Sequence, residues 1–379
     1  MVTAGVYMLA RSYPLLELSP TTMTVIAWVG ALTALMGATI AVVQTDLKRI
    51  LAYSTISQLG FMFLAVGVGA YMAGIFHLVT HAFFKALLFL TAGSVMHATH
   101  GQLNIDLMGG FKKKMPITYW QFLVGALALA GFPLLAGFWS KDEILLGTFV
   151  ENPLLYYISM FTAFLTAFYA FRAVYRVFAG EPRHQRLFDR IHEQPFGMTG
   201  PLWILVVAAL FGGFIGISAG IGDLLAIKNI NQIETWLHPA FEEVEMLHAE
   251  LSIQIRLFLV SGLLAILGIL LAYFRYVRES GWTLALQRLL NPIQPVLENK
   301  YWVDEFYMVV IVRPLRAIAN FFYRIFDQGI IEGVVNGIGK LTTSIGLGVA
   351  HIQTGHLSWS ALSLFIGVVA LLGFFLLVA

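Results

Sequence analysis

Apolar residues are grouped along this chain into long runs with few charges. Such runs cover residues 1–10, 20–43, 47–69, 71–98, 117–150, 155–178, 200–222, 253–275 and 357–379. Most of them exceed about 18 residues, the length at which a run indicates a transmembrane helix rather than a helix in a soluble core. The short alternating strands of a membrane β-barrel are not seen. The pattern therefore predicts an all-α polytopic membrane protein, in which residues 1–10 are the tail of a helix that begins upstream.

The pattern changes between residues 303 and 350. Apolar residues recur there at helical spacing among polar ones, which predicts an amphipathic helix. A helix over the whole segment would be about 70 Å long and would lie along a membrane assembly, ahead of one terminal span. The alternative is two interfacial helices with a break. Pro314 is expected to kink the segment, and the glycines after Gly329 to weaken it.

Composition narrows the chemistry of the chain. Hydrophobic residues make up 59% of it and charged residues only 12%, and it contains no cysteine. Disulfides, cysteine-bound iron–sulfur clusters and thiol chemistry are therefore excluded. No phosphate-binding loop or dinucleotide fingerprint is present. We expect no redox centre, cofactor or metal in this chain.

Positive charge is concentrated in alternate loops. Lysine and arginine gather in residues 44–49, 99–116, 172–198 and 275–302. By the positive-inside rule these loops face the cytoplasm. The alternation agrees with the number of spans, so the two predictions support each other.

The stretch GIFHLVTHAFFKALLFL carries three ionisable side chains inside an apolar run. His77, His81 and Lys85 are four residues apart and so fall on nearly one helix face. An ionisable group in mid-span is costly and normally faces a bundle interior or a wet cavity. Histidine titrates near neutral pH, so the three groups are a candidate proton relay. The alternatives are packing histidines with a hidden acid beside Lys85, or a metal site on the two histidines, which lacks a third ligand nearby.

The stretch ALAGFPLLAGFWSKDEILLG interrupts another span. Gly131, Pro133 and Gly137 predict a broken helix, because proline removes a backbone donor and leaves carbonyls in need of partners. Interrupted helices mark ion paths in transporters. The three residues are therefore candidate hinges.

Charged residues follow this interruption, still inside the predicted span. Lys141 is a candidate relay member, and Asp142 a possible partner that lowers the cost of its charge. Ser140 and Glu143 have the spacing of a capping box, which would explain both as the start of the second half-helix. Lys141 is not explained in that way.

A polar patch lies in the stretch TDLKRILAYSTISQLGFMF. Ser54, Thr55, Ser57 and Gln58 either hydrate a path for protons or hydrogen-bond to neighbouring helices. The sequence does not decide between these two roles.

Three stretches carry a resemblance to a known family. VQTDLKRILAYSTISQLGFMFLA, FHLVTHAFFKALLFLTAGSV and GFWSKDEIL closely resemble the large antiporter-like subunits of respiratory complex I, NADH:quinone oxidoreductase. The resemblance runs over essentially the whole chain, which looks like the C-terminal portion of such a subunit. The family's first repeat, with its intramembrane glutamate and first lysine, has no counterpart here.

The resemblance implies a division of the chain into parts. These are the end of a preceding helix (1–19), the second five-helix antiporter-like repeat (20–178), additional transmembrane helices (179–302), the lateral helix (303–350) and a terminal anchor (351–379).

The resemblance also implies roles for the residues singled out above. Lys85 matches the family's central lysine, His77 and His81 its relay histidines, and Lys141 and Asp142 its terminal lysine and acid. Protons accepted at Lys85 would pass to Lys141 and leave on the non-cytoplasmic side.

A subunit of this family would lie in the bacterial cytoplasmic membrane. Its partners would be other membrane subunits of complex I, above all the neighbouring antiporter-like subunits. FMN and iron–sulfur clusters would be held by partner subunits, and no nucleic acid is expected. The alternatives are a subunit of an Mrp-type cation/proton antiporter or of a membrane-bound hydrogenase, or a structural brace with inert lysines.

Overall fold

The computed structural model describes residues 2–217, 231–241, 250–352 and 355–378. Two units are distinguished, Met1–Tyr301 and Trp302–Ala379, and each is described by itself. Within the described residues, seven helices are long and apolar enough to cross a membrane. The predicted all-α class is confirmed.

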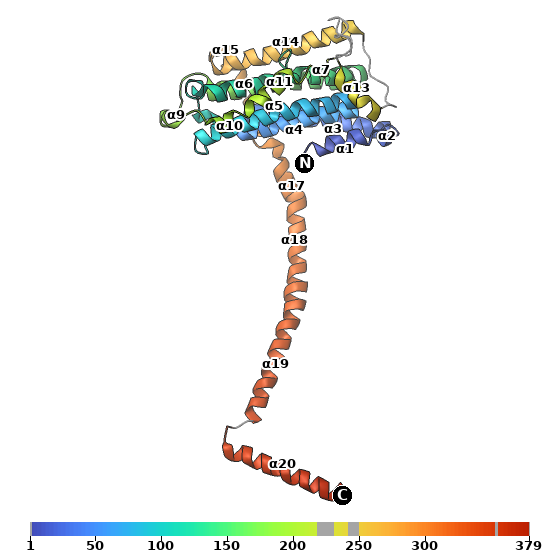
Figure 1. Cartoon of the computed structure of the whole chain (residues 1–379), viewed down its shortest axis with the longest axis vertical. Coiled ribbons are helices and arrows are strands. Elements are labelled where there is room, and N and C mark those ends of the chain that lie inside the picture. Colours follow the sequence, from blue (N-terminus) through green and yellow to red (C-terminus); the bar gives the residue numbers. More distant parts are fainter. Residues whose placement is uncertain (1, 218–230, 242–249, 353–354, 379) are drawn as a thin grey trace. The chain divides into compact units, whose positions relative to one another are not determined.

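The first unit is a bundle of helices (Figure 1). A short helix α1 (Ala4–Arg11) precedes the long helices α3 (Pro20–Val43), α4 (Leu47–Gly67) and α5 (Tyr71–Ala98). The chain continues through α6 (Pro116–Ala130), α7 (Ala136–Glu151) and α8 (Pro153–Phe178). Helix α14 (Leu251–Tyr276) packs along α8.

Small side chains bring α3 and α4 together. Ala27, Ala31, Ala34 and Ala38 recur at helical spacing on α3 and are all buried. Small residues let two helix backbones approach closely. Within lipid there is no hydrophobic driving force between helices, so their association depends on such close packing. The α3–α4 pair therefore provides a rigid wall for the helices that pack on it.

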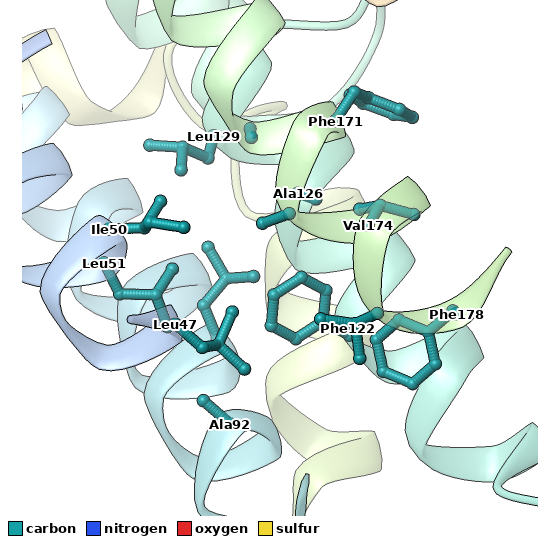
Figure 2. Packing of buried hydrophobic residues seen from close by; sticks show 14 of the residues in the cluster. Leu47, Ile50, Leu51, Ala92, Phe122, Ala126, Leu129, Phe171, Val174 and Phe178 are labelled. Atoms are coloured by element: carbon teal, nitrogen blue, oxygen red, sulfur yellow. The ribbon is translucent and has the colours of Figure 1, made fainter. Parts of the chain in front are cut away.

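A large cluster of apolar side chains is buried in the bundle and reaches one of its ends (Figure 2). We call this the basic end, because the lysine- and arginine-rich loops at residues 99–115 and 179–195 lie there. Side chains from α4, α5, α6 and α8 meet in one buried cluster that includes Leu47, Leu51, Ala92, Phe122, Leu129, Val174 and Phe178. Buried polar side chains, among them Gln121 and Arg172, lie in the same half of the bundle.

The predicted bounds of one span are wrong. Helix α11 covers only Leu202–Phe211, instead of residues 200–222, because the pair Gly212–Gly213 follows. Together with α10 (Phe196–Thr199), the apolar helical run Phe196–Phe211 reaches about 24 Å, shorter than the hydrocarbon core of about 30 Å. Residues 218–222 lie outside the described residues.

The second unit consists of one helical run and a last helix. The run extends without a break from Val303 to Ile352 through α17 (Val303–Tyr307), α18 (Arg313–Phe322) and α19 (Glu332–Ile352). Wide turns of π-helix, Met308–Val312 and Tyr323–Ile331, join these segments. The run is thus one helix rather than two with a break. After it comes α20 (Leu357–Val378), the predicted terminal span.

Pro314 does not break this run. It stands at the second position of α18, directly after the wide turn Met308–Val312. A wider turn leaves room for the proline ring and removes the need for its missing N–H.

Candidate functional site

Three helices bring the predicted relay residues together inside the first unit. Helix α5 carries His77, His81 and Lys85, and α7 carries Lys141. All four side chains are buried, with at most 5% of the surface of each exposed. Both α5 and α7 pack on α4, which supplies the polar patch. The site is therefore a buried polar array in the interior of the bundle.

Lys85 is held by oxygen atoms of α4. Its Nζ donates to the Leu51 carbonyl oxygen at 2.8 Å and to Ser54 Oγ at 2.5 Å. The ammonium also lies 5.3 Å from the ring centroid of Phe89. Ser54, whose role the sequence left open, thus has a defined function as the acceptor for Lys85. The hidden acid of the packing alternative is not among the partners described.

His77 uses both ring nitrogens. Its Nδ1 lies 2.9 Å from Ser140 Oγ on α7, and its Nε2 lies 3.1 Å from Gln58 Oε1 on α4. Thr80 Oγ1 lies 2.7 Å from the same Ser140 oxygen. His77 therefore connects three helices.

The hydroxyl of Ser140 suits both protonation states of His77. When the ring is neutral and its Nε2 donates to Gln58, Ser140 donates to Nδ1. When the ring is protonated, both nitrogens donate. Ser140 can then accept from Nδ1 and turn its hydrogen toward the Ala136 carbonyl oxygen, 3.2 Å away. A change of proton on His77 therefore needs only a rotation of one hydroxyl.

His81 is near the other members of the array. Its ring centroid is 6.2 Å from that of His77, and it is close enough to Lys85 and Lys141 to interact electrostatically with both. Its Nε2 has no hydrogen-bond partner among the described residues. The position links the two lysines through one titratable ring.

Helices α6 and α7 stand where the sequence predicts one interrupted span. Gly131 ends α6 in the left-handed conformation, at φ +72°, which suits glycine because it has no Cβ. Pro133 lies in the connecting segment, and its ring faces Gly262 of α14. A Cβ on Gly137 would stand 2.0 Å from the Ala128 carbonyl oxygen, so only glycine allows α7 to approach α6 this closely.

Lys141 occupies the end of α6. Its Nζ donates to the Leu129 carbonyl oxygen at 3.0 Å, one of the carbonyls that the end of the helix leaves without a backbone donor. A cation at this position is also favoured by the helix dipole. The ring of Phe61 lies 5.5 Å from the ammonium. The break and the buried lysine therefore stabilise each other.

Two predictions about this segment are wrong. Asp142 does not pair with Lys141; its Oδ1 accepts a hydrogen bond from Ser261 of α14 at 2.8 Å. Neighbouring helical residues point about 100° apart, so the two side chains face different helices. Ser140 and Glu143 do not form a capping box either, because α7 begins at Ala136 and Ser140 lies inside it.

The two buried lysines have no counter-ion among the described residues. The ion pairs of Lys113 with Glu181 and of Arg176 with Asp106 involve neither of these lysines. No group of three or more histidine, aspartate or glutamate side chains in those ranges could hold a metal ion. A lysine buried in this way is costly to keep charged.

The sequence missed some members of the array. Thr80 and Tyr169 are both completely buried beside it. A signal for Tyr169 exists on α8, where Thr162, Thr166 and Tyr169 recur at helical spacing in an apolar helix. Thr80 lies three residues after His77 and so on the same face of α5.

The bundle and its buried array can be compared with known membrane proteins. Residues 1–166 match the family described as NADH:quinone oxidoreductase/Mrp antiporter, transmembrane. The structure resembles that of the Mrp complex from Dietzia sp. DQ12-45-1b, with a TM-score of 0.57 and 23% identity, over 100% of this chain and 36% of that one. At this identity the likeness concerns the fold alone.

Relatives in sequence are more specific. The chain is 39% identical to NAD(P)H-quinone oxidoreductase chain 5 of a Picosynechococcus species, over 99% of this chain and 59% of the relative. It is 37% identical to NADH-quinone oxidoreductase subunit L of Neisseria meningitidis, over 98% and 59%. The chain thus spans about three fifths of the length of the curated relatives it matches. Over that length it is a homologue of subunit L, an antiporter-like membrane subunit.

Proposed function

We propose that this chain is part of a proton-translocating membrane subunit of NADH:quinone oxidoreductase. The observation that carries the proposal is the pair of buried lysines, Lys85 and Lys141, which lack counter-ions among the described residues and have His81 near both. The names of the relatives supply the complex in which the subunit works.

The proton route follows the array. A proton accepted at Lys85 passes by way of His81 to Lys141 at the end of α6, and His77 tunes this step through Ser140. Redox energy comes from partner subunits that hold FMN and iron–sulfur clusters, and it reaches this chain electrostatically. The membrane is the bacterial cytoplasmic membrane.

Protons fit this array better than metal cations do. Hard metal cations are bound by several oxygen ligands, commonly carboxylates together with carbonyl groups and water. The titratable side chains of the described array are two amines and two imidazoles, with no carboxylate among them, and these groups repel cations when protonated. The related Mrp antiporter function is therefore the second candidate.

The test combines purification of the complex with a measurement of proton transport. The complex that contains this chain is isolated from its membrane and assayed for NADH oxidation, quinone reduction and bound flavin. It is then reconstituted into vesicles, and acidification is recorded in buffers with and without sodium. NADH-driven acidification that is independent of sodium supports the proposal. A complex without NADH-oxidising subunits, or acidification driven by a sodium gradient, contradicts it.

A further inference from the structure

The first turn of α6 is held by a residue from a distant part of the chain. Glu193 lies in the loop at residues 179–195 and takes no part in the route above. Its Oε2 accepts from the backbone N–H of Ile117 at 2.7 Å and from that of Thr118 at 3.3 Å, and its Oε1 accepts from the Thr118 hydroxyl at 2.6 Å. Met115, the residue before α6, provides no side-chain cap. Glu193 therefore satisfies N–H groups that the start of a helix leaves without partners.

The segment that carries Glu193 is itself fixed to α5 and α6. Buried Gln121 of α6 donates from Nε2 to the Thr199 carbonyl oxygen at 2.7 Å. Toward the end of α5, His97 Nδ1 lies 2.7 Å from Oε1 of Gln194, the residue after Glu193. These contacts anchor the chain directly after Glu193, so the carboxylate is held on a fixed support.

The other end of α6 holds Lys141. Helix α6 has 15 residues and is about 22 Å long. In its last turn the Leu129 carbonyl oxygen accepts from Lys141 Nζ at 3.0 Å. The free N–H groups of a first turn and the free carbonyl groups of a last turn point along the helix axis, in opposite directions. The contacts with Glu193 and with Lys141 therefore both act along the axis of one helix, and the helix dipole favours the carboxylate and the ammonium at these ends.

Small side chains line the second half of α6. Gly125, Ala126, Ala128 and Ala130 are all buried there. Helices that pack on each other are held in place by ridges that fit into grooves, and small side chains make shallow ridges. Hydrogen bonds at the two ends therefore contribute much of what fixes α6 along its axis.

We infer that Glu193 is a positioning residue for proton translocation, which holds α6 along its axis so that the Leu129 carbonyl oxygen stays within hydrogen-bond distance of Lys141 Nζ. The inference rests on the proposed function, in which Lys141 is the last member of the route. It adds a residue in a loop of the basic end that acts on Lys141 through the length of α6. Because α6 is a continuous helix, a shift of its first turn is carried to its last turn.

The test replaces Glu193 in the assembled complex. Glu193→Ala removes the carboxylate, whereas Glu193→Gln keeps an oxygen that can accept from the same two N–H groups. The matched control is Glu181→Ala, in the same loop, where an exposed carboxylate pairs with Lys113 at 3.3 Å. Acidification of vesicles per assembled complex is measured for each variant, together with hydrogen exchange of the backbone amides of α6.

We expect Glu193→Ala to lower the rate of proton translocation per assembled complex by about fivefold, well within the loss of about 100-fold that a misplacement of about 1 Å can cause. Glu193→Gln should restore most of the rate, and Glu181→Ala should translocate as the unsubstituted complex does. In Glu193→Ala, amide exchange should rise at residues 127–131 as well as in the first turn of α6.

A cap with a purely local role would give a different result. Glu193→Ala would then raise exchange only in the first turn of α6 and reduce the amount of assembled complex, but the rate per assembled complex would stay the same. That outcome overturns the inference, as does a Glu193→Gln complex that is as slow as Glu193→Ala. If Glu193→Ala does not assemble, Thr118→Val replaces it in the test, because it removes only the hydroxyl bond of 2.6 Å to Glu193. Thr118→Val should also slow translocation, and a normal rate in that variant overturns the inference.

Lys85→Met in the same assay separates the two proposals. If Lys85→Met stops translocation and Glu193→Ala does not affect it, the proposed function stands and the role of Glu193 is wrong. If an assembled Lys85→Met complex translocates normally, the proposed function itself fails, and the inference fails with it.

Discussion

Replacing Ser140 by alanine tests how α5 and α7 communicate. Ser140 Oγ is the atom on α7 that contacts both His77 Nδ1, at 2.9 Å, and Thr80 Oγ1, at 2.7 Å. Alanine fits the same space but leaves the histidine nitrogen without its partner. If the site binds no replacement water, this nitrogen is then buried and unpaired whenever His77 is protonated.

The magnitude follows from that unpaired group. A buried donor left without an acceptor costs about 1 to 3 kcal/mol. If protonation of His77 accompanies proton transfer through His81, the barrier rises by the same amount, and the translocation rate falls by about 5- to 150-fold. NADH oxidation should slow in parallel when the enzyme is tightly coupled.

The assay is acidification of vesicles that carry the complex, normalised to the amount of assembled complex. The matched control is Ser94→Ala on α5, where the buried hydroxyl donates only to its own helix, to Leu90 at 3.3 Å. Ser94→Ala should translocate normally. Normal translocation by Ser140→Ala as well would refute the reasoning that a hydroxyl must reverse its hydrogen bond for His77 to change protonation.

Three further substitutions follow from the structure. Lys141→Met should leave the Leu129 carbonyl unpaired and stop proton exit; normal translocation by the assembled variant would count against Lys141 as a relay group. Gly137→Ala should reduce assembly on native gels, because its Cβ would meet the Ala128 oxygen, whereas Gly93→Ala on α5, with open space around the Cβ, should assemble normally. Arg172→Leu should destabilise the complex by about 1.5 to 3 kcal/mol, because buried Arg172 donates a hydrogen bond to the Gln44 carbonyl at 2.6 Å. The control is Arg186→Leu, at an exposed site. Equal unfolding midpoints for the two variants would show that this hydrogen bond is unimportant.

The long helices could be predicted closely from the sequence because their apolar runs end at clear signals. The predicted run 20–43 is α3 to the residue, and the run 71–98 is α5. The prediction of a span at residues 200–222 was wrong because average hydrophobicity does not show that Gly212 and Gly213 end a helix. Apolar runs measure burial in lipid, whereas helix ends depend on single residues.

The members of the array were predictable where they share one helix. His77, His81 and Lys85 lie on one face of α5, as their spacing requires. Partners on other helices were not predictable in the same way. Adjacency in sequence suggested a Lys141–Asp142 pair, but the two side chains face α6 and α14. Tyr169 is 84 positions from Lys85 in the chain, so only the packing of α4 and α8 brings it near.

The central claim is that Lys85 carries protons. The measurement that tests it most directly is the number of protons translocated per NADH oxidised by vesicles carrying the Lys85→Met complex, with assembly checked on the same membranes. Lys113→Met, at an exposed ion pair with Glu181, is the control. Our account predicts that the ratio falls for Lys85→Met and stays unchanged for Lys113→Met. An unchanged ratio in an assembled Lys85→Met complex would contradict it and would favour a purely structural role for the array.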